Sequence, residues 1–93
     1  MNFVTELVAD EHYRYVPLGQ YVVRAEGVCG GRPTFKYTRI EILGALERLA
    51  ARESIEAISQ GYEGRVSSEG IQEALQIVKR PFLQALPALP HAA

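Results

Sequence analysis

Cysteine and histidine are scarce in this chain: among its 93 residues there are one cysteine and two histidines. A lone cysteine cannot form an internal disulfide bond, so nothing indicates an oxidising compartment. Protein metal sites take three or four ligands, and His12 and His91 lie outside the motif that contains Cys29. We therefore predict no metal and no cofactor, and we expect Cys29 to be a small, buried or half-buried thiol.

Paired catalytic groups and long apolar runs are missing as well. We find no nucleophile beside a base and no convincing pair of acids, so we predict neither an enzyme nor a small-molecule substrate. No segment approaches the ~20 apolar residues of a membrane span. Residues 1–6 lack the basic start and apolar core of a signal peptide. We expect a cytoplasmic protein that makes no membrane contact.

Net charge is small, at −1, whereas a strongly basic domain would indicate nucleic-acid binding. The charge is nevertheless uneven. Residues 21–40 hold four cations and one acid, a net charge of +3, and residues 41–60 hold two cations and four acids, a net charge of −2. The sequence thus predicts a dipolar surface.

The N-terminal third combines one helical pattern with three strand patterns. Residues 3–11 fit a short amphipathic helix, because apolar side chains recur on one helical face. Residues 12–16 and 20–24 are rich in aromatic and β-branched residues, and residues 34–38 alternate, so we predict three strands. A sheet this small leaves its strand edges exposed, and a domain of this length buries little surface when it folds. Both features favour a homodimer.

After residue 39 the hydrophobic period becomes helical. Residues 42–50 predict an amphipathic helix. A second helix is expected to begin after Ser54, its N-cap, and to end near Gly61. A third helix is expected to begin at Ser67 or Ser68. The chain therefore has a β-rich first third followed by three short helices.

Residues 27–40 read Gly-Val-Cys-Gly-Gly-Arg-Pro-Thr-Phe-Lys-Tyr-Thr-Arg-Ile, with three glycines, one proline and three cations. Backbone N–H groups of the Gly30–Gly31 loop could cradle a phosphate. The segment lacks the ending of a P-loop and the spacing of a dinucleotide fingerprint. A tight turn that needs positive φ is the simpler interpretation.

This motif resembles the signature of the domain-of-unknown-function family 433, whose usual form contains Cys-Gly-Gly-Arg-Pro followed by Gly-Thr-Arg-Ile-Pro. Residues 49–51 and 54–58 look like later segments of that family, as do Tyr62 with Gly64, and the resemblance covers about residues 21–79. It implies a tri-helical, helix-turn-helix-like domain after a short β element. The family's members are typically small prokaryotic proteins, and many resemble VapB-type antitoxins of toxin–antitoxin systems, encoded beside a PIN-like ribonuclease toxin.

The sequence departs from the family pattern at several positions. Tyr37 stands where glycine is usual, and Glu41 and Glu63 replace prolines. One extra residue lies between Tyr62 and Ile71. We divide the chain into three parts, which are an N-terminal extension over residues 1–20, the family-like domain over residues 21–80, and an apolar, proline-containing tail over residues 81–93.

Two sets of polar residues are candidates for DNA contact, one in the motif and one on the outer face of the third helix. Cations grip phosphates and glutamines can read adenine, whereas Glu69 and Glu73 on that helix would repel the DNA backbone. Structural arginines and a plain solvated helix face remain the simpler interpretations. The candidates are Arg32, Lys36, Arg39, Gln72, Gln76 and Lys79.

The tail begins at Pro81, which is expected to break or restart the third helix. Its apolar side chains could dock into a groove of a partner, or pack across this domain or a second copy of it. The candidate partner-binding residues are Phe82, Leu83, Leu86 and Leu89.

Taken with the resemblance, these patterns predict a mainly α fold with a tri-helical, homeodomain-like or winged-helix-like core and a short N-terminal β element. The resemblance implies an antitoxin-like protein that binds a PIN-like ribonuclease and, as a dimer, operator DNA. The alternative is a structural or adaptor dimerisation domain that binds no nucleic acid.

Overall fold

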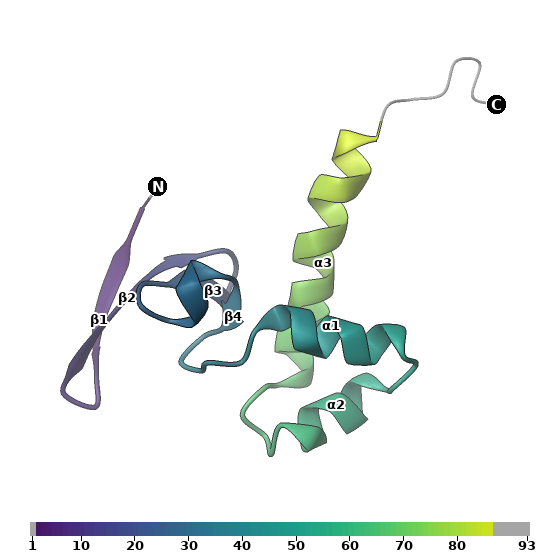
Figure 1. Cartoon of the computed structure of the whole chain (residues 1–93), viewed down its shortest axis with the longest axis horizontal. Coiled ribbons are helices and arrows are strands. Elements are labelled where there is room, and N and C mark those ends of the chain that lie inside the picture. Colours follow the sequence, from purple (N-terminus) through teal and green to yellow (C-terminus); the bar gives the residue numbers. More distant parts are fainter. Residues whose placement is uncertain (1, 87–93) are drawn as a thin grey trace.

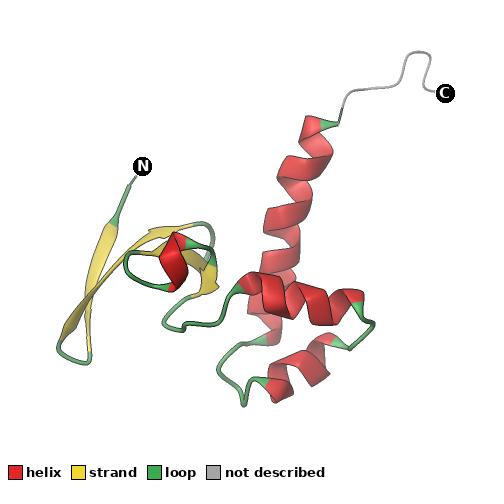
Figure 2. Ribbon diagram, viewed as in Figure 1, coloured by secondary structure: helices red, strands yellow, loops and turns green. Residues whose placement is uncertain are grey.

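The computed structural model describes residues 2–86, with only the backbone of residues 82 and 83, and shows an antiparallel sheet followed by three helices (Figures 1 and 2). The strands lie in the sheet in chain order, β1-β2-β3-β4. A single 3-10 turn, η1, precedes β4. The elements are β1 (Val4–Val8), β2 (Glu11–Pro17), β3 (Val22–Ala25), η1 (Cys29–Gly31), β4 (Thr34–Phe35), α1 (Ile42–Ala50), α2 (Ile55–Gly61) and α3 (Ser68–Ala85).

This α+β architecture shows that the predicted mainly α fold was wrong. The main error concerns residues 3–11, for which we predicted a helix and which instead supply β1. Val4 pairs with Tyr15 and Val8 pairs with Glu11 in an antiparallel hairpin. The hairpin turns at Ala9 and Asp10, which both have positive φ, as a two-residue hairpin turn requires. Pairing with β2 outweighs a helical pattern that was too short to be stable alone.

A small apolar cluster packs against the sheet. Tyr15, Val23 and Ala25 are buried there, and Tyr13 and Val28 pack against them. These side chains come from neighbouring strands and from the loop after β3. The cluster therefore fixes the β1–β2 hairpin against the segment that carries the Cys-Gly-Gly-Arg-Pro motif.

A second apolar cluster joins the sheet to the three helices, which lie where the sequence predicted helices. The predicted N-cap is also confirmed, because the Ser54 hydroxyl accepts a hydrogen bond from the Ala57 amide at 3.1 Å. Fully burying one aliphatic side chain in this apolar cluster stabilises the fold by about 1.5–3 kcal/mol. The buried members are Val22, Phe35, Ile42, Ala45, Ile58, Val66, Ile71 and Ala74.

Helix α3 is longer than predicted. Ser67 is its N-cap, since its hydroxyl accepts a hydrogen bond from the Gly70 amide at 3.0 Å. The expected break at Pro81 was wrong, because α3 continues through this residue to Ala85. Pro81 is exposed and has no amide hydrogen to donate to the Ile77 carbonyl one turn earlier. The C-terminal half of α3 projects beyond the sheet and the other helices (Figure 1).

None of the helices within residues 2–86 is long and apolar enough to cross a membrane.

Candidate functional site

The motif forms the connection from β3 to α1, and its glycines serve a tight turn, as predicted. Gly30 and Gly31 have φ values of 63° and 80°, a region that favours glycine. The Arg24 side chain donates a hydrogen bond from Nε to the Gly31 carbonyl at 2.9 Å. The turn is therefore held from the neighbouring strand. The Cys29 thiol is half-buried and donates to the Arg39 carbonyl at 3.3 Å.

Arg32 forms an ion pair within the chain. Its Nε donates to Glu41 Oε1 at 2.8 Å, and its Nη2 lies 3.4 Å from Glu41 Oε2. Hydrogen bonding to Arg32 lowers the pKa of the Glu41 carboxyl, and the same contact raises the pKa of Arg32. Glu41 immediately precedes α1, so this pair ties the motif to the first helix.

Lys36 is also engaged inside the molecule, in what we call the Glu6 cluster, made of Glu6, Tyr15, Lys36 and Tyr37. Glu6 accepts hydrogen bonds from the hydroxyls of Tyr15 and Tyr37, the latter at 2.7 Å. The Lys36 ammonium lies 3.6 Å from Glu6 Oε2. These contacts, with the Tyr15 hydroxyl first, lower the pKa of Glu6. Contact with the Tyr15 hydroxyl raises the pKa of Lys36. The cluster connects β1 to the segment after β4.

Tyr37, at the position where the family usually has glycine, has the backbone conformation that glycine would favour. Its φ is 67°, which is rare for a bulky side chain. Its amide donates to the Tyr13 hydroxyl at 3.0 Å, and the two ring centroids lie 5.4 Å apart. The Tyr37 side chain is nevertheless 53% exposed. Neighbouring residues thus fix the backbone while much of the ring faces solvent.

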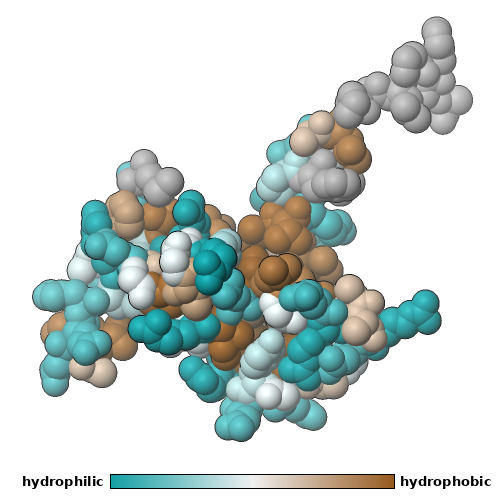
Figure 3. All heavy atoms as spheres, in the orientation of Figure 1, coloured by the Kyte–Doolittle hydropathy of each residue, from teal (hydrophilic) through white to brown (hydrophobic). Residues whose placement is uncertain are grey.

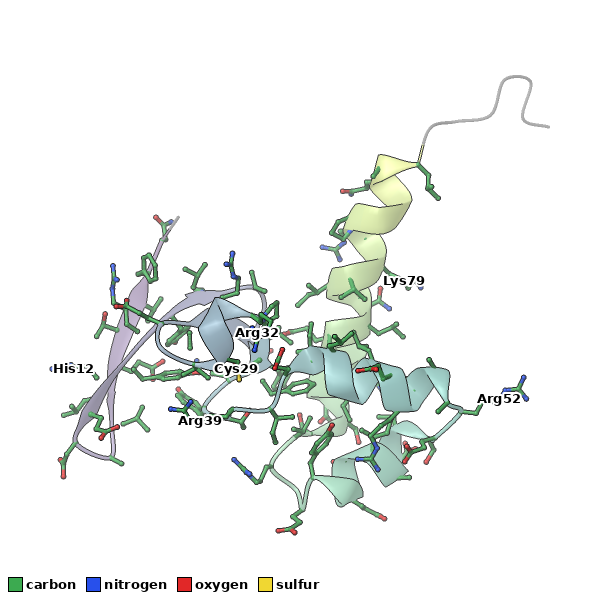
Figure 4. All side chains as sticks on the ribbon, viewed as in Figure 1. His12, Cys29, Arg32, Arg39, Arg52 and Lys79 are labelled. Atoms are coloured by element: carbon green, nitrogen blue, oxygen red, sulfur yellow. The ribbon has the colours of Figure 1, made fainter. Side chains whose placement is uncertain are left out.

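Arg39 differs from Arg32 and Lys36, because its side chain forms no ion pair or hydrogen bond with another of residues 2–86. It lines a surface groove of about 430 Å³ together with Tyr13, Tyr37 and Arg65. Figure 4 shows Arg39 on the loop between the sheet and α1, close to Cys29. Arg65, which we did not single out from the sequence, precedes α3 and also makes no ion pair within the described residues.

The structure does not bring the two sets of candidate DNA-contacting residues together. Gln72, Gln76 and Lys79 are exposed on α3, as predicted for its outer face. Lys79 points away from the sheet, whereas Arg32 and Arg39 lie on the opposite side of α3 (Figure 4). One continuous DNA surface would have to include both sides of the helix.

Glu73 has a structural contact that sequence reasoning missed. Its carboxylate accepts hydrogen bonds from the amides of Gln20, Tyr21 and Val22 at 2.9, 2.7 and 3.0 Å. These amides belong to the turn between β2 and β3 and to Val22, the first residue of β3. Space is tight there, because a Cβ atom on Gly19 would lie 2.4 Å from Glu73 Oε1. The helical period places Glu73 on a polar face but cannot show that a turn of the sheet meets that face.

The apolar stripe of α3 continues beyond the part that is buried. Ile71 and Ala74 are fully buried, whereas Val78 is 42% exposed and Leu86 is 54% exposed. Figure 3 shows apolar surface along α3 next to α1. Among the other tail candidates, the side chains of Phe82 and Leu83 and the whole of Leu89 lie outside the described residues.

Residues 2–86 contain no group of three or more histidine, cysteine, aspartate or glutamate side chains that could hold a metal ion.

Comparison with known proteins identifies one family. The sequence model of the family described as "Protein of unknown function (DUF433)" matches residues 22–76. Searches of curated proteins and of solved structures found no match. The family match begins at β3, so β1 and β2 lie outside it. Since it nevertheless spans more than half of the chain, this protein belongs to the DUF433 family.

Proposed function

We propose that this protein is an antitoxin-like protein that binds a PIN-like ribonuclease through the exposed end of α3. The observation that carries the proposal is the apolar stripe that continues past the helical core. Its exposed members are Val78, Ala85 and Leu86, which we call the α3 stripe. The identity of the partner rests on the family resemblance, in which antitoxin-like members accompany PIN-like toxins.

The α3 stripe has the spacing of a helix that lays one face in a groove. Ile71, Ala74, Val78 and Ala85 are separated by three, four and seven residues, so they share one helical face. Docking an amphipathic helix into an apolar groove is a common mode of protein recognition. The first two residues of this face are buried inside the domain, and the later ones are free to contact a partner.

Operator binding has less support than partner binding. Arg32 and Lys36 form ion pairs with Glu41 and Glu6, so their charge is partly neutralised within the chain. Glu69 lies in the first turn of α3, where it would repel a DNA backbone. The proposal is therefore confined to protein binding.

A second candidate is an adaptor that dimerises through the β1 edge of its sheet. The observation in its favour is that β1 forms an edge of the sheet and has exposed apolar side chains, among them Leu7 at 68% exposure. A strand edge of this kind can pair with a second copy. In this case a partner nuclease is unnecessary.

The test is to recover the tagged chain from its native host at low salt with added nuclease, and to identify the co-purifying proteins by mass spectrometry. We expect a PIN-like ribonuclease in about equal amount. Recovery of the chain alone, as a dimer by light scattering, would contradict the antitoxin proposal and favour the adaptor.

A further inference from the structure

Two surface grooves meet at Tyr37 and Arg65, and neither is needed for the partner binding proposed above. The first has a volume of about 430 Å³, and its walls include Arg39 and Tyr13. The second has a volume of about 330 Å³, lies toward the start of α3, and its walls include Lys36. Tyr37 and Arg65 belong to both walls, so the grooves adjoin at these two side chains. Each volume lies in the range of small-molecule sites, which begins at about 300 Å³.

The first groove contains two arginines whose side chains have no acceptor among residues 2–86. Arg39 and Arg65 are exposed, and neither side chain is ion-paired or hydrogen-bonded to another of residues 2–86. Arg32, by comparison, is held by the carboxylate of Glu41. A guanidinium group presents a planar fork of donors that matches the oxygen atoms of a phosphate. Two such groups in one wall therefore favour a phosphate-bearing ligand.

Acidic residues do not cancel this charge. The walls of the first groove include Glu11 and Glu26. Glu26 is already paired, because its Oε2 atom lies 2.6 Å from Arg14 Nη1. Counted together with Arg14, the charged side chains at the groove are three arginines and two glutamates, a net charge of +1.

Tyr37 supplies an aromatic surface at the junction of the grooves. Its φ of 67° is a strained conformation, of the kind that persists where surrounding contacts fix it and that is common at ligand sites. The Tyr13 hydroxyl holds its amide at 3.0 Å and Glu6 holds its hydroxyl at 2.7 Å. The backbone and the hydroxyl of Tyr37 are thus both held, and the residue remains 53% exposed.

We propose that these grooves bind a nucleoside phosphate, with the base against the Tyr37 ring and the phosphate hydrogen-bonded to Arg39 and Arg65. Stacking on an aromatic side chain combined with arginine contacts is how proteins hold unpaired nucleotides. The nucleotide is either a free one or part of a single strand that follows both grooves, and the two sources share this chemistry. The site requires neither the α3 stripe nor a PIN-like ribonuclease.

The test is to titrate the full chain with AMP, adenosine, inorganic phosphate and a single-stranded oligoadenylate of about ten nucleotides. Binding is monitored by the chemical shifts of the backbone amides. The variants are Tyr37→Gly, which suits the positive φ and removes the ring, Arg39→Gln and Arg65→Gln. Arg52→Gln is the matched control, because Arg52 is exposed between α1 and α2 and points away from the grooves (Figure 4). The amide spectrum of each variant shows whether the fold is intact.

We expect AMP to shift the amides of residues 37, 39 and 65, and to bind about tenfold tighter than adenosine or phosphate alone. Each of the three variants should weaken AMP about tenfold, and Arg52→Gln should leave it unchanged. Tighter binding of AMP than of the oligonucleotide assigns the site to a free nucleotide, and the reverse assigns it to a strand. Absence of saturable binding for both, or equal affinity in all variants, would overturn the proposal. Val78→Glu should not alter the titration, which separates this site from partner binding.

Discussion

At the scale of single residues, Glu73 shows why side-chain roles are harder to predict than helices. The sequence places it on the outward face of the third helix, whereas the structure has it half-buried against the sheet. Its three amide partners lie more than fifty positions earlier, in the β2–β3 turn and at the start of β3. For Tyr37 the backbone is easier to predict than the side chain. The family's usual glycine at this position already indicates the positive φ. The hydrogen bond that anchors its hydroxyl comes from Glu6, in a strand that was not predicted.

Replacing Glu73 with glutamine should destabilise the fold. A carboxylate that accepts three backbone hydrogen bonds becomes a neutral amide with a single acceptor oxygen, and hydrogen bonds to charged groups contribute about 1.5–3 kcal/mol each. We expect Glu73→Gln to lower the free energy of unfolding by about 2 kcal/mol in a urea titration. Glu47→Gln, an exposed carboxylate on α1, is the control and should change it little. Equal effects would show that the contact with the turn does not stabilise the protein.

Removing the Tyr37 hydroxyl should have a smaller effect. Tyr37→Phe keeps the ring and loses only the hydrogen bond to Glu6, so we expect the melting temperature to fall by a few degrees. Tyr21→Phe is the comparison, because the Tyr21 hydroxyl has no hydrogen-bond partner within residues 2–86. Thermal unfolding followed by circular dichroism measures both. A Tyr37→Phe protein as stable as the Tyr21→Phe protein would argue against the Glu6 cluster as a clamp.

At the scale of elements, the three helices were predicted and the first strand was not. Residues 42–50 have a clear 3.6-residue period, and their apolar face meets α3, so local pattern and tertiary packing agree. Residues 3–11 are too short for a stable isolated helix, and their structure is set by pairing with β2. Neither pattern shows that α3 would continue through Pro81, because the penalty of a proline depends on its surroundings.

The projecting end of α3 should become more ordered when Pro81 is replaced. Proline in a helix interior is about 3 kcal/mol less favourable than alanine. In Pro81→Ala we therefore expect amide hydrogen exchange of residues 82–85 to slow by about 10- to 100-fold. Residues 70–76 are held by the core and should be unaffected. Unchanged exchange at residues 82–85 would contradict this prediction, because it would show that Pro81 does not limit the stability of this helix end.

At the scale of the whole molecule, three ion-paired carboxylates link parts of the fold that are distant in sequence or in different elements. Glu6 joins β1 to the segment after β4, and Glu41 joins the start of α1 to the motif. Glu53 closes the α1–α2 turn through a hydrogen bond from Arg48 Nε to its Oε2 atom at 3.0 Å. Loss of these carboxylate charges should therefore loosen the molecule as a whole.

Stability should decrease in acid because the pKa values of all three carboxyls lie below their ordinary value of 4.5. Hydrogen bonds from Tyr15, Arg32 and Arg48 respectively are the main causes. A carboxyl whose pKa is lowered by folding stabilises the fold fully above its unfolded pKa and loses that contribution as the pH falls through its folded pKa. We expect the urea midpoint to be level near pH 6 and to fall below about pH 4.5.

Charge-removing variants test this pH dependence. Glu6→Gln should flatten the acid limb of the curve, since one of the three shifted carboxyls is gone. Glu63→Gln should keep the wild-type slope, because the Glu63 carboxylate has no ion-pair partner within residues 2–86. Identical slopes in the two variants would contradict the assignment of the acid sensitivity to Glu6.

Binding of a PIN-like ribonuclease by the α3 stripe is tested most directly by the amount of ribonuclease recovered per tagged chain from the native host. Val78→Glu places a charge on the stripe, and Gln76→Glu, the matched control, places the same charge on the opposite face of the helix. We predict about one ribonuclease per chain for the wild type and for Gln76→Glu, and at least tenfold less for Val78→Glu, with circular dichroism confirming that both variants are folded. Equal recovery by the two variants, or no ribonuclease with the wild type, would contradict the account.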